Sequence, residues 1–200
     1  RIKDPGCKYD EMVVLESHQQ GLNKSTAIRI LCPDSKWFSD DLPLNVNGQR
    51  VIEATVGKWI IEASELVGRR ADREHLKSML SRQEDHARMA YGHFPVHKLR
   101  EFIIIGTTNS DDYLTDPTGS RRIWPLRVKT FDIVKLTAMR DQLWAEAVVR
   151  EARGDSIRLP EELWPAAGEE QARRQEGNAF EEVLGDLLWH QEVRQVRART

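Results

Sequence analysis

The sequence predicts an α/β fold, with a parallel sheet flanked by helices and a helical segment at the C-terminal end. Continuous apolar runs lie within residues 58–66 and 101–109, and both runs end on polar side chains, as strands buried on both faces of a parallel sheet do. Segments with helical spacing alternate with these strands, which is typical of α/β proteins. The pattern changes near residue 130, so we expect a core over residues 1–130 and a helical segment over residues 131–200.

Composition limits the class of protein. The chain has 200 residues, of which 40% are hydrophobic, enough for a sizeable core. A formal net charge of −2 excludes a globally basic nucleic-acid binder, so any such contact must come from a local patch. Cys7 and Cys32 are too few for a disulfide framework and fit a reducing compartment. Without a signal peptide or an apolar run of roughly 20 residues, we expect a cytoplasmic protein with no membrane partner. The abrupt start at Arg1 favours one domain of a longer chain.

The first strand is expected around Val13–Leu15, and a polar loop leads from it to Lys24, where an apolar-periodic helix begins. This layout is typical of a phosphate-binding loop between a strand and a helix. In such a loop, backbone N–H groups and the helix N-terminus receive phosphate, the lysine reaches the terminal phosphates and the next hydroxyl binds Mg²⁺. The candidate nucleotide-binding residues are therefore Gly21, Asn23, Lys24, Ser25 and Thr26, with Ser25 as a metal ligand.

The remaining elements follow in order along the chain. A short strand is expected at 37–41, a helix at 50–55, a strand at 58–66, a helix at 70–80, and a hairpin whose arm at 85–92 turns near 92–95. The strand at 101–109 is followed by a turn at 116–122 and a strand at 123–128, which Pro125 places at a sheet edge or a bulge. Helices are expected at 132–154, after Pro160, and at 181–197.

Further polar groups follow the strands, and the carboxyl ends of parallel strands meet at one sheet edge. Glu62 and Glu65 follow the apolar run 59–61, where carboxylates can bind a magnesium-associated water or accept its proton. Asn109, at the end of the strand 101–109, can orient that water. Arg121 and Arg122 lie on a glycine turn, from which an arginine can reach a neighbouring subunit's γ-phosphate.

Each of these features also has a purely structural interpretation. Lys-Ser-Thr is a common helix-capping sequence, acids often mark the solvent end of a strand, and arginine pairs are usually solvated. The order of the features along the chain favours the nucleotide site. Positive charge near the hairpin makes Arg88, Lys98 and Arg100 candidate DNA contacts, with ordinary solvated charges as an equal alternative.

On the C-terminal helices we expect charged and aromatic residues to have structural roles. Arg173 and Arg174 are interpreted as part of a solvated helix face, because they lie among Glu and Gln residues. We expect three tryptophans, Trp144, Trp164 and Trp189, to be core or interhelix anchors rather than base-stacking platforms.

Residues 58–66, 80–92, 106–109 and 116–125 together resemble the virulence-associated protein E family. The resemblance covers residues 4–150. It implies a P-loop ATPase fold similar to superfamily 3 (AAA+-like) helicases, which phages, plasmids and genomic islands carry, often behind a primase. It further implies ATP and Mg²⁺ as cofactors, single-stranded or forked DNA as partner, and a homo-oligomer such as a hexameric ring.

The resemblance also implies roles for single residues. Lys24 and Ser25 belong to the Walker A loop, Glu62 and Glu65 to the Walker B region, Asn109 to sensor 1, and Arg121 or Arg122 to an arginine finger. The metal ligands would be Ser25 and Glu62.

The chain departs from the family in the Walker A loop, where His18 and Asn23 replace two glycines. Asn23 is expected to keep the turn, because asparagine tolerates left-handed backbone angles, whereas His18 would be strained if its position required positive φ. Three functions remain open. They are an ATP-dependent DNA helicase or replication-initiation ATPase, a nucleotide-insensitive module for oligomerisation or DNA and replisome binding, and a switch that binds ATP but hydrolyses it slowly.

Overall fold

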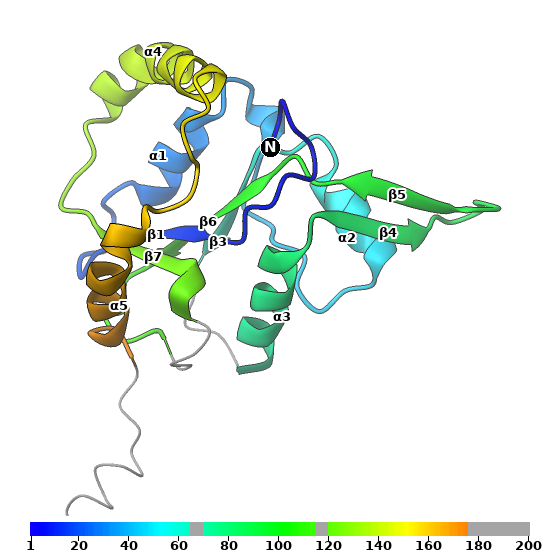
Figure 1. Ribbon diagram of the computed structural model, residues 1–200, viewed down its shortest axis with the longest axis horizontal. Helices are drawn as coiled ribbons and strands as arrows, with labels where there is room; N and C mark the ends of the chain where they lie inside the picture. Colours follow the sequence, from blue (N-terminus) through cyan, green and yellow to red (C-terminus); the bar gives the residue numbers. More distant parts are fainter. Residues whose placement is uncertain (65–69, 115–119, 176–200) are drawn as a thin grey trace, which may run out of the picture.

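The computed structural model describes residues 1–64, 70–114 and 120–175 (Figure 1). Its main sheet has five parallel strands, which confirms the predicted α/β class with a parallel sheet. In spatial order the strands are β2 (Phe38–Ser39), β3 (Ile60–Ser64), β6 (Ile103–Thr108), β1 (Met12–Glu16) and β7 (Ile123–Arg127). Pro125 lies on the edge strand β7, as predicted, where its missing N–H costs no ladder hydrogen bond on the open side.

Helices alternate with the strands as the sequence predicts. They are α1 (Lys24–Leu31), α2 (Gly48–Thr55), α3 (Arg70–Ser81), α4 (Ile133–Ala152) and α5 (Trp164–Ala172), with 3₁₀ turns η1 (Ser35–Trp37), η2 (Ser120–Arg122) and η3 (Glu161–Leu163). The helix expected at 181–197 lies outside the described residues, as does most of the turn at 116–122. Within the described ranges, no helix combines the length and the apolar character needed to cross a membrane.

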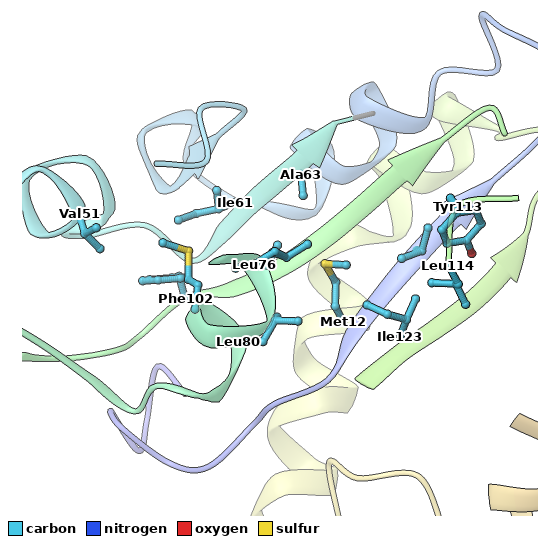
Figure 2. Close-up of a cluster of buried hydrophobic side chains, with 13 residues drawn as sticks. Met12, Val51, Ile61, Ala63, Leu76, Leu80, Phe102, Tyr113, Leu114 and Ile123 are labelled. Carbon is cyan, nitrogen blue, oxygen red and sulfur yellow. The ribbon is translucent and has the colours of Figure 1, made fainter. Parts of the chain in front are cut away.

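Alternate residues of each central strand face opposite layers of helices. Met12 and Val14 of β1 point into the larger apolar cluster, which α2 and α3 cover (Figure 2). Val13 and Leu15 point to the other face, where α1 contributes Ile28. The three-layer arrangement explains why these strands are continuous apolar runs, since both of their faces are buried.

Tryptophans join α4 to the rest of the molecule. Trp144 Nε1 donates a hydrogen bond of 2.7 Å to the carbonyl of Leu31, and its ring lies edge-on to Trp59 at 5.5 Å. Trp59 in turn stacks on Trp37 at 3.9 Å. Trp144 is therefore the interhelix anchor that was expected. The expectation for Trp164 was wrong, because 58% of this residue is exposed. Trp189 lies outside the described residues.

Strands β4 (Glu84–Arg88) and β5 (Pro95–Leu99) form the predicted hairpin, which extends away from the main sheet (Figure 1). Arg100 fixes its base: its Nε and Nη2 each donate a hydrogen bond of 2.6 Å to the carboxylate of Asp85, and its Nη1 donates to the carbonyl of Met79. Only 2% of Arg100 is exposed. The prediction that Arg100 contacts DNA was therefore wrong, because its guanidinium is buried in a structural ion pair.

Candidate functional site

The loop between β1 and α1 contains two residues with left-handed backbone angles. Asn23, the N-cap of α1, has φ 59° and ψ 31°, and Gly21 has φ 76°. The expectation that Asn23 keeps the left-handed turn is thus confirmed. The Asn23 side chain makes no capping hydrogen bond, so the first N–H groups of α1 are not satisfied by this side chain.

His18, at the other substituted glycine position, is free of the strain that positive φ would bring. The described non-glycine residues with positive φ are Asn23, Asn45 and Tyr91, and His18 is not among them. Its side chain is more than half exposed, and its Nδ1 lies 2.8 Å from Oδ2 of Asp111. This substitution therefore imposes no left-handed backbone on the loop.

Lys24 is buried at the start of α1 and already has hydrogen-bond partners. Its Nζ donates to Oγ of Ser17 and to Oδ1 of Asn109, both at 2.6 Å. Burial lowers the pKa of Lys24 below its ordinary value of 10.5, while the nearby carboxylate of Glu62 acts in the opposite direction. The ammonium therefore lies in a poorly solvated position at the end of β6, where it interacts strongly with negative charge.

Ser25 and Glu62 meet beside this lysine. Ser25 Oγ donates a hydrogen bond of 2.6 Å to Oε1 of Glu62, and Thr107 Oγ1 donates to the same oxygen at 2.8 Å. Glu62 lies inside β3, two residues before its end, and is almost fully buried. A hydroxyl and a carboxylate oxygen are ligands of the kind that Mg²⁺ takes beside phosphate groups, so the residues present fit the expected metal.

A pocket of about 320 Å³ opens between this loop and the ends of β3 and β6. Its described lining consists of Gly21, Leu22, Asn23, Lys24, Ser25, Thr26, Ser64, Thr107, Thr108 and Asn109. All five residues predicted to bind nucleotide are among them. Parallel register explains the convergence, because Glu16 pairs with Thr108 and Ser64 with Thr107, so these strands end at one edge.

Other predicted site residues lie elsewhere. Glu65 falls outside the described residues. Arg121 and Arg122 lie on η2 and are not part of the described pocket lining. Arg88 is exposed on the hairpin, where its Nε donates to the carbonyl of Gly92, and Lys98 pairs with Glu101 at 3.3 Å.

The family model of the virulence-associated protein E-like domain matches residues 1–176. The chain belongs to this family. Membership supports a replication-related role in mobile genetic elements.

Solved structures of the NrS-1 C-terminal region are also similar to this virulence-associated protein E-like domain. The apo structure of residues 305–718 has 12% identity and a TM-score of 0.48, with coverage of 68% of this chain and 36% of that chain. The A form apo structure of the same region has 10% identity and a TM-score of 0.46, with coverage of 90% of this chain and 43% of that chain. The chain thus spans less than half of these structures. Comparison with curated protein sequences finds no match.

Sequence reasoning missed a buried ion cluster in this domain, centred on Glu16 at the end of β1. Glu16 is 1% exposed, and Arg174 donates to both of its carboxylate oxygens at 2.5 Å. Arg127 Nε and the hydroxyl of Tyr113 each add a hydrogen bond of 3.1 Å. The interpretation of Arg174 as solvated was wrong, because only 6% of it is exposed, although Arg173 lies at the surface as expected.

Opposing effects set the protonation of this cluster. Burial by itself would raise the pKa of Glu16, but hydrogen bonds from Arg174 and Arg127 outweigh it and lower the pKa below its ordinary value of 4.5. Hydrogen bonds to Glu16 raise the pKa of Arg174. The sequence held one signal for this cluster: Glu16 directly follows the apolar run Met12–Leu15. A carboxylate buried at that position needs a cationic partner.

Proposed function

We propose that this domain binds Mg–ATP in the pocket beside Lys24 and hydrolyses it, as one subunit of a helicase or replication-initiation ATPase of a mobile genetic element. One observation carries the proposal. Lys24 and Ser25 at the start of α1 make hydrogen bonds to Asn109 at the end of β6 and to Glu62 on β3, respectively. Lys24, Ser25 and Asn109 line one pocket, and Glu62 lies behind Ser25.

The chemistry assigns a role to each side chain. The ammonium of Lys24 stabilises the β- and γ-phosphates, and its contacts with Ser17 and Asn109 hold it near the pocket before the ligand arrives. The amide of Asn109 orients the attacking water, and Glu62 accepts its proton directly or through a second water. Mg²⁺ bound by Ser25, Glu62 and the phosphate oxygens would neutralise developing charge.

The hairpin supports a role with single-stranded DNA. Its tip carries Tyr91 and Phe94, which are 104% and 81% exposed, and Arg88 lies beside them. Exposed aromatic rings stack on bases without sequence preference, while arginine and lysine bind phosphates. We therefore assign DNA binding to Arg88 and Lys98 together with the two aromatic residues.

The arginine turn supports a homo-oligomer. In this scheme Arg121 or Arg122 stabilises the γ-phosphate of a neighbouring subunit, which makes hydrolysis depend on assembly. A closed ring, such as a hexamer, would give every subunit one such neighbour. A primase, fused to the domain or bound to it, would supply the companion activity.

A second candidate is a module of the same fold that does not respond to nucleotide. Its support is that Lys24 already makes two hydrogen bonds of 2.6 Å, which a triphosphate would have to replace. The backbone of the loop argues against this candidate, because Asn23 keeps the left-handed turn and His18 is unstrained.

Calorimetric titration with Mg–ATP, together with turnover measured with and without single-stranded DNA, separates the candidates. Wild-type protein should bind Mg–ATP and hydrolyse it faster with DNA. Lys24→Ala should lose binding by at least about tenfold, because it removes the charge that faces the phosphates. Glu62→Gln should retain binding but lose turnover.

Glu146→Gln is the matched control, since Glu146 lies on the exposed surface of α4 and pairs with Arg150. This variant should bind and hydrolyse like wild type. If the assembled wild-type protein binds no Mg–ATP, the ATPase proposal fails and the nucleotide-insensitive module replaces it.

A further inference from the structure

We propose that Arg174 is a positioning residue that couples three parts of the domain: the nucleotide loop at residues 17–23, helix α5 and the arginine turn η2. The effect on nucleotide rests on the function proposed above. The coupling itself is a property of the folded chain and is testable without nucleotide.

Helix α5 docks on the sheet through polar groups. Its buried residue is Gln171, whose Nε2 donates a hydrogen bond of 2.8 Å to the carbonyl of Ile123 on β7. Just beyond the helix, the carbonyl of Arg174 accepts hydrogen bonds from the N–H groups of Tyr113 and Leu114, at 3.2 and 3.0 Å. Buried polar groups need their partners in a defined geometry, so α5 should be either fully docked or released.

The guanidinium of Arg174 extends this docking to the nucleotide loop. It binds both oxygens of Glu16, the last residue of β1. The next residue, Ser17, receives the hydrogen bond from Lys24 Nζ, and its own N–H donates to the carbonyl of Thr108 at 3.3 Å. The position of Glu16 therefore determines where the loop starts and where the lysine is held.

A second, more exposed route reaches the same loop. Arg127 binds Glu16 through Nε and binds Asp111 through Nη2, both at 3.1 Å. Asp111 in turn pairs with His18 at 2.8 Å. His18 stands where the family has glycine, so this substitution adds a polar link between the loop and the buried carboxylate.

Helix α5 also packs against η2, next to its contact with β7. The turn η2 carries Arg121 and Arg122, so release of α5 would disturb this turn together with the nucleotide loop. Two sites that bias one docking equilibrium are coupled reciprocally. Nucleotide in the loop should thus favour docked α5 and a fixed arginine turn.

Hydrogen–deuterium exchange of the whole chain tests this coupling. The variant Gln171→Ala removes one neutral hydrogen bond of α5, which Gln171 makes to the carbonyl of Ile123 and not to Glu16 or to residues 17–23. We expect exchange to accelerate at least about threefold in α5, and also in the peptides covering residues 17–27 and 120–122. Arg174→Met should accelerate exchange in all three segments by about tenfold or more, whereas α3 should keep its wild-type rates.

Arg173→Met is the matched control, because Arg173 is adjacent, exposed and paired only with Glu170 among the described residues. It should leave all three segments at wild-type rates. If Gln171→Ala accelerates exchange in α5 while residues 17–27 and 120–122 keep wild-type rates, the proposal is overturned. If Arg174→Met unfolds the chain, the Gln171→Ala result alone decides. The absence of Mg–ATP binding by wild type would refute the proposed ATPase without affecting these comparisons.

Discussion

At the residue scale, the two substituted glycine positions of the nucleotide loop differ in backbone conformation. Asn23 occupies the left-handed region, where a side chain costs about 1 kcal/mol, and its side chain makes no capping hydrogen bond that glycine would lose. Asn23→Gly should therefore stabilise the fold by up to about 1 kcal/mol and raise Mg–ATP affinity up to about fivefold. Denaturant unfolding and calorimetric titration measure the two effects.

His18→Gly is the comparison for that variant. It relieves no positive φ and removes the contact with Asp111, so we expect no gain in stability or affinity. A larger gain from His18→Gly than from Asn23→Gly would contradict this assignment of the loop geometry.

The two cysteines should differ sharply in reactivity. Burial raises the pKa of the Cys32 thiol to about 11, so little thiolate forms near neutral pH, whereas Cys7 is partly accessible. With a maleimide at pH 8, Cys7 should react first, and Cys32 should react at the rate of unfolding. Peptide mass spectrometry follows both sites. Equal rates for the two thiols in the native protein would show that Cys32 is less protected than its burial indicates.

At the element scale, the basic residues of the β4–β5 hairpin have different roles: Arg100 forms a buried ion pair at its base, whereas Lys98 lies near the surface. Arg100→Met should cost about 3–5 kcal/mol, because it leaves the buried carboxylate of Asp85 without its partner. Lys98→Ala should change stability by less than about 1 kcal/mol, because Lys98 forms only a partly exposed pair with Glu101. Denaturant unfolding measures both values.

For binding of single-stranded DNA we expect the opposite: the change at Lys98 should have the larger effect, because the charge of Arg100 is buried. Lys98→Ala should weaken this binding and reduce its dependence on salt concentration, which fluorescence anisotropy detects. Unchanged DNA binding by a variant that lacks both Arg88 and Lys98 side chains would remove the hairpin from the DNA site.

The ion cluster that docks α5 predicts an acid-sensitive element. Because the folded chain lowers the pKa of Glu16, this carboxylate contributes stability above about pH 4.5, and the contribution is lost as pH falls through the lower folded value. Glu16→Gln should cost about 3–5 kcal/mol at pH 7, since it leaves the buried Arg174 unpaired, and less at pH 3. Unfolding curves between pH 3 and 7 give both differences. An equal cost at both pH values would contradict a charged Glu16 in the native state.

At the scale of the whole molecule, the sequence predicted the elements and the meeting of Lys24, Ser25, Glu62 and Asn109 at one sheet edge, but not the buried ion pairs between distant elements. The strand at β6 and the turn at Asn23 follow from neighbouring residues, through apolar continuity and backbone preference. The Glu16–Arg174 pair joins residues 158 positions apart, and the sequence around either residue does not identify its partner. Likewise Lys98 and Arg100 are both basic residues in the same short segment, but only Arg100 has its charge buried. Burial of a charge depends on tertiary packing, which a single sequence shows only indirectly.

Assembly provides the last prediction, because Arg121 and Arg122 lie outside the described pocket lining of their own subunit. We expect an Arg121→Ala/Arg122→Ala variant to bind Mg–ATP and fail to hydrolyse it, while Lys24→Ala fails to bind.

If the turn acts on a neighbour, mixing the two inactive proteins restores turnover, because intact arginines of one subunit then face an intact pocket of the other. Random assembly of a closed ring would place such a pair at about a quarter of the interfaces. A mixture of Lys24→Ala with Glu62→Gln is the control and should stay inactive, since both changes damage the pocket itself. Loss of nucleotide binding in the arginine variant, or no recovery in its mixture, would exclude a role between subunits.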